Sequence, residues 1–241
     1  MLLACERRHS KMEVIFIIYS LAHDMATILM KLSEGRASRQ YNRWISLLTL
    51  WQDGAMRNYI IDKVLPKRGR ILDIGCGTGK LLIEVGRKGF KGVGIDMNQS
   101  MIEVAEEESK RRNLSHRLKF EIGNALELNL PEEPFDVVVS TLMISELQQS
   151  ELEQFISAAS KYVKSEGILV IGGEGEPDNF LFDLFLGFIR RVSYWIVSRL
   201  TGLASHPYHQ VAIAMKKSGL DVKYQVRFLS GFLTLYVGKV K

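Results

Sequence analysis

An acidic residue followed by a glycine-rich turn is the part of this chain best suited to ligand chemistry. Asp73 ends a short apolar run, and Gly75, Gly77 and Gly79 follow it at alternate positions. Glycines let the backbone approach a ligand without a Cβ in the way. The apolar residues that come next are typical of a helix, whose first N–H groups are unpaired. This combination predicts a binding site where a strand ends and a helix begins.

The spacing and charge of this turn indicate which ligand it takes. A dinucleotide-binding loop usually reads Gly-x-Gly-x-x-Gly and holds a pyrophosphate on the helix N-terminus. Here Gly79 comes one residue early and Asp73 precedes the first glycine. A carboxylate repels pyrophosphate, but it suits a ligand that carries a cation or an ammonium group. Asp96, at the end of the next apolar run, can accept hydrogen bonds from both hydroxyls of a ribose.

Residues 71–80 resemble motif I of class I S-adenosylmethionine (SAM)-dependent methyltransferases, and residues 96–105 resemble the second motif of that family. The resemblance implies SAM as cofactor and S-adenosylhomocysteine (SAH) as product. It also implies that the glycine turn packs on the methionine part, that Asp96 binds ribose and that Met97 packs on adenine. Asn124 stands where the family often has an aspartate that accepts from the adenine amino group, which an amide oxygen can also do. The Ala125 N–H would meet an adenine ring nitrogen.

The end of the fourth predicted strand bears on the acceptor. Ligands of open α/β sheets lie beyond the carboxyl ends of the strands, so Ser140 and Thr141 should line the methyl-transfer region. Amino-methylating enzymes on nucleic acids commonly have an Asn/Asp-Pro-Pro-aromatic motif here, and this chain lacks it. It also lacks a cysteine here that could serve pyrimidine C5 methylation. Both observations argue against a nucleic-acid partner.

The chain also resembles, more narrowly, the ubiquinone and menaquinone biosynthesis methyltransferases. That group often has Tyr-Asp where this chain has Tyr41-Asn42, and the tyrosine helps to close the cofactor site. The expected cofactor-binding residues are therefore Tyr41, Asp73, Gly75, Cys76, Gly77, Gly79, Asp96, Met97, Asn124, Ala125, Ser140 and Thr141.

The resemblance favours a small or lipid-like apolar acceptor, methylated at carbon or oxygen as on a quinone-like or isoprenoid ring. A phospholipid or amine N-methyltransferase is the alternative enzyme, and a non-catalytic SAM-binding or membrane-associated module is the alternative of another class. A sulfonium donor is already activated, so a general base is needed only if the acceptor must lose a proton. No catalytic residue is assigned; the candidates for a base are His206, Tyr208, His209 and Glu174.

Alternating apolar segments must position these residues. Strands are predicted over 70–74, 92–96, 119–122, 135–140 and 167–172, with helices over 80–88, 99–113 and 150–163 between them. This alternation predicts a doubly wound α/β fold with a seven-stranded, mostly parallel sheet. Segments 222–229 and 232–240 predict a C-terminal antiparallel hairpin.

Two further regions flank the core. Residues 1–65 are expected to form an N-terminal helical extension, with a helix over 41–65 that stops at Pro66. Residues 66–241 are expected to form the methyltransferase core, with an apolar helical lid inserted at about 177–206. That insertion is either a helix packed on the sheet or a wall for an apolar substrate.

Composition sets the remaining expectations. The net charge of +5 permits an anionic partner without demanding one. The two cysteines lie far apart and no metal-ligand cluster appears, which predicts a cytoplasmic protein without a metal. The apolar run over 14–22 is shorter than a membrane span requires. We expect peripheral contact with a membrane surface; the alternative is that the apolar faces are buried within the protein or in a homodimer.

Overall fold

The structure is a computed structural model that describes residues 52–130, 133–144, 147–175, 210–228, 231 and 233–240. The predicted N-terminal helix, residues 41–51 of the helix predicted over 41–65, and the inserted lid lie outside these ranges. So do four of the candidate site residues, Tyr41, His206, Tyr208 and His209.

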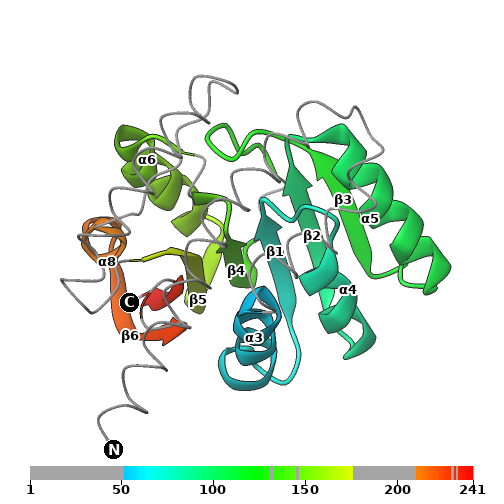
Figure 1. Cartoon of the computed structure of the whole chain (residues 1–241), viewed down its shortest axis with the longest axis horizontal. Helices are drawn as coiled ribbons and strands as arrows, with labels where there is room; N and C mark the ends of the chain where they lie inside the picture. The colour runs from blue at the N-terminus through cyan, green and yellow to red at the C-terminus, as the bar shows by residue number, and fades with distance from the viewer. Residues whose placement is uncertain are drawn as a thin grey trace, which may run out of the picture.

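Seven strands form one sheet, in the order β3-β2-β1-β4-β5-β7-β6 (Figure 1). Strands β1 to β5 are parallel, and β7 runs antiparallel to both β5 and β6. The predicted doubly wound sheet with a C-terminal antiparallel hairpin is therefore confirmed. The strands are β1 (Arg70–Ile74), β2 (Lys91–Asp96), β3 (Leu118–Ile122), β4 (Phe135–Thr141), β5 (Val163–Glu174), β6 (Leu220–Phe228) and β7 (Leu233–Val240).

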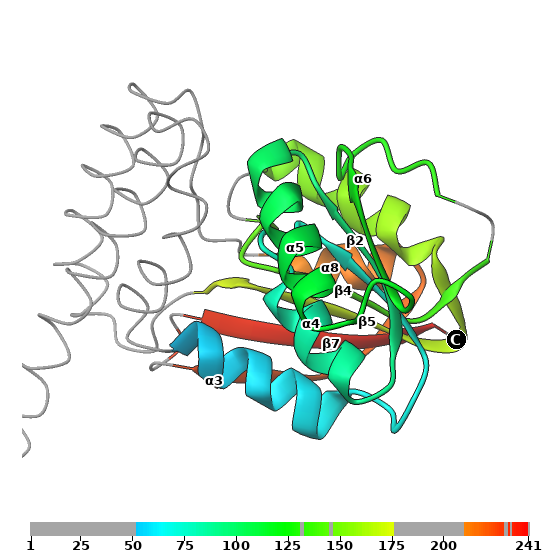
Figure 2. The same ribbon diagram turned by 90° about the vertical axis from the view of Figure 1, so that its right-hand side faces the viewer.

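Helices cover both faces of the sheet (Figures 1 and 2). Residues of α3 (Gln52–Tyr59), α4 (Lys80–Arg87) and α5 (Gln99–Arg111) pack into one buried cluster, together with the π-helical turn η1 (Ile60–Val64). Residues of α6 (Gln149–Ser160) and α8 (Val211–Lys217) pack into the other cluster. The face with α3, α4 and α5 carries the candidate site.

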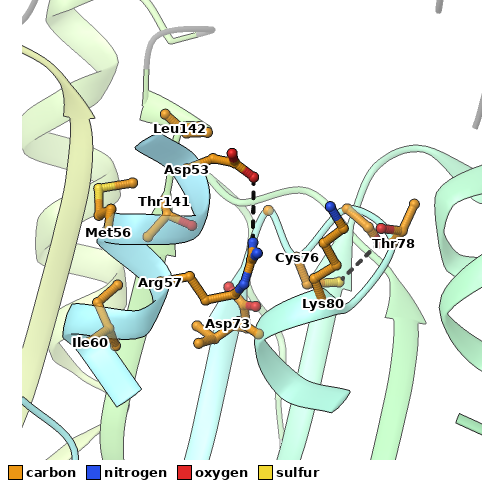
Figure 3. Close-up of a pocket in the computed structure, with 13 residues that line it drawn as sticks. Asp53, Met56, Arg57, Ile60, Asp73, Cys76, Thr78, Lys80, Thr141 and Leu142 are labelled. Carbon is orange, nitrogen blue, oxygen red and sulfur yellow. Dashed lines mark hydrogen bonds and ion pairs between the residues drawn. The ribbon is translucent and has the colours of Figure 1, made fainter. Parts of the chain in front are cut away.

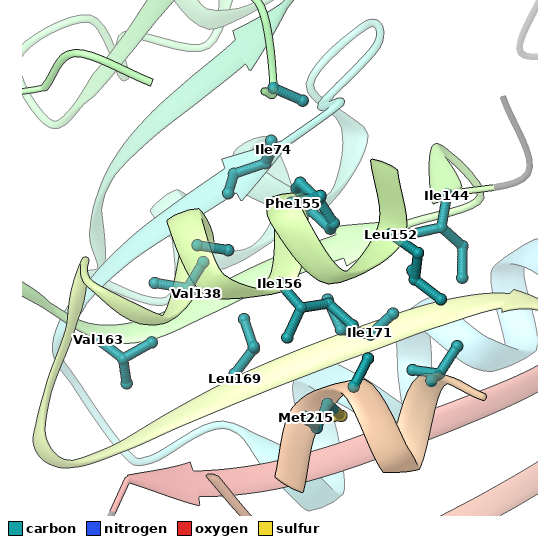
Figure 4. Packing of buried hydrophobic residues seen from close by; sticks show 14 of the residues in the cluster. Ile74, Val138, Ile144, Leu152, Phe155, Ile156, Val163, Leu169, Ile171 and Met215 are labelled. Atoms are coloured by element: carbon teal, nitrogen blue, oxygen red, sulfur yellow. The ribbon is translucent and has the colours of Figure 1, made fainter. Parts of the chain in front are cut away.

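Alternation along β1 explains how one strand serves two cores. Ile71 belongs to the α3–α4–α5 cluster, whereas Leu72 and Ile74 belong to the cluster under α6 and α8. Figure 4 shows this second cluster, in which Phe155 and Ile156 of α6 lie over the strands. Each such buried aliphatic or aromatic side chain contributes roughly 1.5–3 kcal/mol of transfer free energy. A central strand buried on both faces accounts for the continuous apolar run that precedes the turn.

Three predicted boundaries needed correction. Helix α6 ends at Ser160 rather than at 163, because Val163 already pairs with Phe135 at the start of β5. Strand β5 therefore begins four residues before the predicted position, and it crosses an irregularity near Glu166, whose φ is 65°. Helix α8 was not predicted. The helix predicted over 41–65 ends in a π-helical turn, and Leu65 is extended because it precedes Pro66.

Candidate cofactor site

The glycine turn connects β1 to α4 and bends beside the end of β2. Gly75, Gly77 and Gly79 all have positive φ, at 74°, 53° and 71°. A Cβ on Gly75 would lie 2.5 Å from Met143, and one on Gly79 would lie 2.6 Å from the Phe120 ring. A Cβ on Gly77 would meet nothing within 4 Å. The outer two glycines thus allow close packing, while Gly77 presents its backbone to open space where a ligand can lie.

Asp73 lies behind this turn, at the end of β1, and is only 2% exposed. None of the described residues donates a hydrogen bond to its Oδ1 atom. Burial, together with a smaller contribution from the neighbouring Asp96 carboxylate, raises the pKa of Asp73 from 3.8 to about 7. A buried carboxylate oxygen without a donor is costly, so this position favours a ligand that brings a cation or an N–H group.

Asp96, at the end of β2, is held very differently. Its Oδ2 accepts a hydrogen bond of 2.8 Å from the Gly77 N–H, and its Oδ1 accepts one of 2.9 Å from the Asn98 N–H. Burial raises its pKa, and these two hydrogen bonds lower it in part. The carboxylate is thereby fixed beside the glycine turn, with lone pairs left to accept from the hydroxyls of a sugar.

A pocket opens between this turn and α3 (Figure 3). Figure 3 shows the α3 side chains on one side and Cys76, Thr78 and Lys80 on the other. The lining residues come from α3 (Asp53, Met56, Arg57, Ile60), the end of β1 and the turn (Asp73, Gly75, Cys76, Gly77, Thr78), α4 (Lys80, Leu81) and the end of β4 (Thr141, Leu142).

Charged groups from α3 and α4 meet at this pocket. Arg57 donates from Nε to Glu84 Oε1 at 3.1 Å, and its Nη1 lies 3.5 Å from Asp53 Oδ2. Burial lowers the pKa of the Lys80 ammonium, and the nearby Arg57 guanidinium lowers it further. The α3 wall opposite the glycine turn therefore presents the Asp53–Arg57 pair beside the apolar side chains of Met56 and Ile60.

Of the two residues expected at the end of β4, Thr141 lines the pocket and Ser140 does not. The Ser140 side chain is fully buried and, by alternation, shares the face of Val138, which belongs to the α6–α8 cluster. Leu142, which also lines the pocket, has φ 65° and so holds a strained conformation that L-residues with bulky side chains rarely adopt.

The residues expected around adenine lie at the ends of β2 and β3. Met97 is 70% exposed, which leaves its side chain available to cover a ring, and Ile122, which pairs with Asp96 on β2, is 59% exposed. Asn124 Oδ1 accepts from the Leu126 N–H at 3.0 Å, so the turn already uses one of its two lone pairs. Ala125 is buried. These roles toward adenine stay predictions.

Of the candidate general bases, Glu174 is the one within the described ranges. It ends β5 and is 4% exposed, but it does not line the pocket beside the glycine turn.

Among the described residues, no group of three His, Cys, Asp or Glu side chains could hold a metal ion. Within the same ranges, no helix is both long and apolar enough to span a bilayer.

Sequence reasoning missed the contribution of α3. Asp53, Met56, Arg57 and Ile60 fall at spacings of three and four residues, so one helix face was readable from the sequence. That this face meets the glycine turn was not readable, because it depends on how α3 docks against β1 and α4. The strain at Leu142 likewise had no signal in the sequence.

The fold and the loop together define a Rossmann-like domain with a nucleoside-cofactor type of site. Residues 65–178 match the family model described as a methyltransferase domain. The resemblance found in the motifs is therefore confirmed over these residues.

Curated relatives support the same assignment. Demethylmenaquinone methyltransferase from Lactobacillus johnsonii is 26% identical over 153 residues, which cover 62% of each chain. Ubiquinone biosynthesis O-methyltransferase from Bartonella quintana is 33% identical over 102 residues, which cover 42% of this chain and 40% of that one. The chain thus matches less than two thirds of the length of these relatives.

Solved structures share the fold. Geranyl diphosphate C-methyltransferase from Streptomyces coelicolor A3(2), solved with Mg²⁺, geranyl diphosphate and SAH, has a TM-score of 0.62 at 12% identity. The match covers 84% of both chains. At this identity the likeness extends to the fold alone.

Proposed function

We propose that this chain transfers a methyl group from SAM to a small or lipid-like apolar acceptor. The observation that carries the proposal is the buried Asp73 carboxylate, whose Oδ1 receives no hydrogen bond from the described residues, beside a glycine turn whose middle glycine faces open space. SAM carries a sulfonium and an ammonium group, and either would offset the cost of that buried carboxylate. A dinucleotide would instead bring its pyrophosphate toward it.

In this proposal the cofactor lies across the glycine turn. Asp96 accepts hydrogen bonds from the ribose, Met97 and Ala125 contact adenine, and Asn124 accepts from the adenine amino group. The methionine part lies over Gly75, Cys76, Gly77 and Gly79, beside Asp73, and Thr141 and the backbone of Ser140 border the methyl group. Tyr41 closes the site. The protein's main task would be to align the acceptor with the methyl group, since the sulfonium is already activated.

The acceptor class is inferred from the relatives and from the sequence of the insertion. One relative is named a demethylmenaquinone methyltransferase and another a ubiquinone biosynthesis O-methyltransferase, and a fold neighbour was solved with geranyl diphosphate. A quinone-like or isoprenoid acceptor, methylated at carbon or oxygen, is therefore the leading form of the proposal. The apolar residues over 177–206 would wall off such an acceptor, and His206, Tyr208, His209 or Glu174 would supply a base if the acceptor must lose a proton.

Transfer of tritium from methyl-labelled SAM into a crude lipid extract tests the function. We expect label in a neutral lipid fraction that carries quinone or isoprenoid groups. Label in phospholipid would instead identify an N-methyltransferase. If no fraction takes up label while the protein binds SAH, it is a non-catalytic module, and the proposed activity is wrong.

Contact with a membrane is a second part of this proposal, supported by the basic residues Lys11, Arg190, Arg191 and Arg199 beside apolar segments. Each cation near an anionic surface contributes about 1 kcal/mol, and salt screens this effect. Flotation with anionic vesicles at low and high salt tests it. A protein that stays entirely in the soluble fraction at low salt would argue for apolar faces buried in the chain or in a homodimer.

A further inference from the structure

We propose that Arg57 of α3 binds the carboxylate of the cofactor's amino-acid tail, while Glu84 of α4 holds the guanidinium in position. The proposal rests on the proposed function, because it concerns the same site. It adds a residue outside the glycine turn and outside the second motif, from a helix that precedes the matched methyltransferase domain.

Charge is the first argument. The pocket is lined by two nearly buried carboxylates, Asp73 at 2% and Asp53 at 6% exposure. These acids suit the sulfonium and the ammonium of SAM, but they repel its third charged group, the carboxylate. That group must therefore lie against a cation. Among the described lining residues, the cations are Arg57 and Lys80.

The position of α3 is the second argument. Asp96 lies at the end of β2, on the side of the glycine turn away from the α3 wall, and its carboxylate is fixed by the Gly77 and Asn98 N–H groups. A cofactor whose ribose is held there extends over the turn, past Asp73, toward the pocket that α3 closes. The amino-acid tail then ends beside Arg57, which lies on the α3 side of this pocket in Figure 3.

The state of the guanidinium is the third argument. Its Nε is engaged by Glu84 at 3.1 Å, which fixes the plane of the fork. Its contact with Asp53 is loose, since 3.5 Å exceeds the usual 2.7–3.2 Å of an N–H···O hydrogen bond. The side chain is 20% exposed, so water competes weakly for it. A fixed, largely desolvated guanidinium with loosely used terminal nitrogens is suited to two parallel hydrogen bonds with a carboxylate.

Two ligands that differ by one carboxylate test the assignment in the full chain. We expect Arg57→Met to weaken SAM binding by at least about tenfold, because charge-assisted hydrogen bonds are lost. Binding of decarboxylated SAM should change by less than about twofold, since it lacks the partner group. Arg57→Lys should recover part of the SAM affinity, because it keeps the charge and loses the fork. Calorimetry on the wild type and on both variants measures the affinity for each ligand.

Matched variants separate binding from structure. Lys88 and Asp62 form an exposed ion pair of 3.0 Å that also joins α4 to the segment after α3, away from the pocket. Lys88→Met should leave both affinities unchanged. If Arg57→Met or Arg57→Lys weakens both ligands equally, Arg57 is structural and the inference is wrong. It is also wrong if Lys80→Met, and not Arg57→Met, removes the preference for SAM. If the wild-type chain binds neither ligand, the proposed function itself fails.

Discussion

Two carboxylates end neighbouring strands beside the same glycine turn, but they differ in burial and in the hydrogen bonds that they accept. Asp96 accepts from two backbone N–H groups, so its charge is supported before any ligand arrives. Asp73 is more deeply buried, and none of the described residues donates to its Oδ1. The region around Asp96 is thus preorganised, whereas the region around Asp73 is destabilised in the absence of a ligand. A cationic ligand would offset the cost of the buried Asp73 carboxylate. At Asp96 it would find hydrogen-bond acceptors that are already held in place.

The largest expected effect comes from removing the preorganised carboxylate. Asp96→Ala should lower SAM affinity at least tenfold, because two charge-assisted hydrogen bonds to the ribose are worth roughly 1.5–3 kcal/mol each. Asp136→Ala is the matched control. Its carboxylate accepts from the Arg70 N–H and from Lys164 at the opposite end of the strands. Unchanged affinity in Asp96→Ala by calorimetry would remove the ribose assignment.

The destabilised carboxylate should reveal itself in the pH dependence of stability. The pKa of Asp73 is raised in the folded state from 3.8 to about 7. The folded protein therefore holds this proton more tightly than the unfolded chain, and the free energy of unfolding falls as pH rises from about 4 to about 7. Asp73→Asn should flatten this slope and stabilise the ligand-free protein at pH 8 by on the order of 1–4 kcal/mol.

Urea unfolding at pH 5 and pH 8 measures the effect. The same substitution should weaken SAM binding, because the amide carries no negative charge. A variant that is less stable than the wild type at pH 8 would mean that the Asp73 carboxylate is already satisfied in the ligand-free protein.

Backbone strain at the turn gives the smallest effect. Gly79→Ala should lower the free energy of unfolding by more than the roughly 1–2 kcal/mol that a left-handed conformation costs an L-residue. The reason is that the new Cβ would also lie 2.6 Å from the Phe120 ring. Gly219→Ala isolates the conformational cost, since its φ is 82° and its Cβ would meet nothing within 4 Å. If both substitutions lower the free energy of unfolding equally in thermal or urea unfolding, the Phe120 ring moves aside at no cost and the predicted clash is wrong.

The residues that the sequence could reveal are those whose arrangement depends on local structure. Asp73, the glycines and Asp96 were identified from the chain alone. Asp73 and the glycines belong to one strand–turn–helix unit, and Asp96 ends β2, the parallel strand next to β1. Strand positions were also readable, since buried parallel strands are continuous apolar runs. Helix α8 was missed although Val211, Ala214 and Met215 have helical spacing and Gly219 follows the helix. A seven-residue helix gives too short a periodic signal to stand out.

The pocket wall could not be derived in the same way. Arg57 lines the same pocket as Asp73 and the glycine turn only because α3 docks on the sheet through Met56 and Ile60. The sequence also carries no signal for the π-helical turn that follows α3 or for the positive φ of Leu142. Ser140 and Thr141 illustrate the limit at the level of single residues. They are adjacent in sequence, but alternation sends the Thr141 side chain to the pocket and the Ser140 side chain to the opposite core.

The most direct test of the central claim, that Asp73 and the glycine turn form a site for a cationic methyl donor, is SAM affinity as a function of pH. Because Asp73 must lose its proton to serve a cation, SAM affinity should rise several-fold between pH 5.5 and 7 and then level off. Asp73→Asn should remove this rise. The account is contradicted if calorimetry finds no SAM binding, NAD bound in its place, or one affinity for SAM across the whole range.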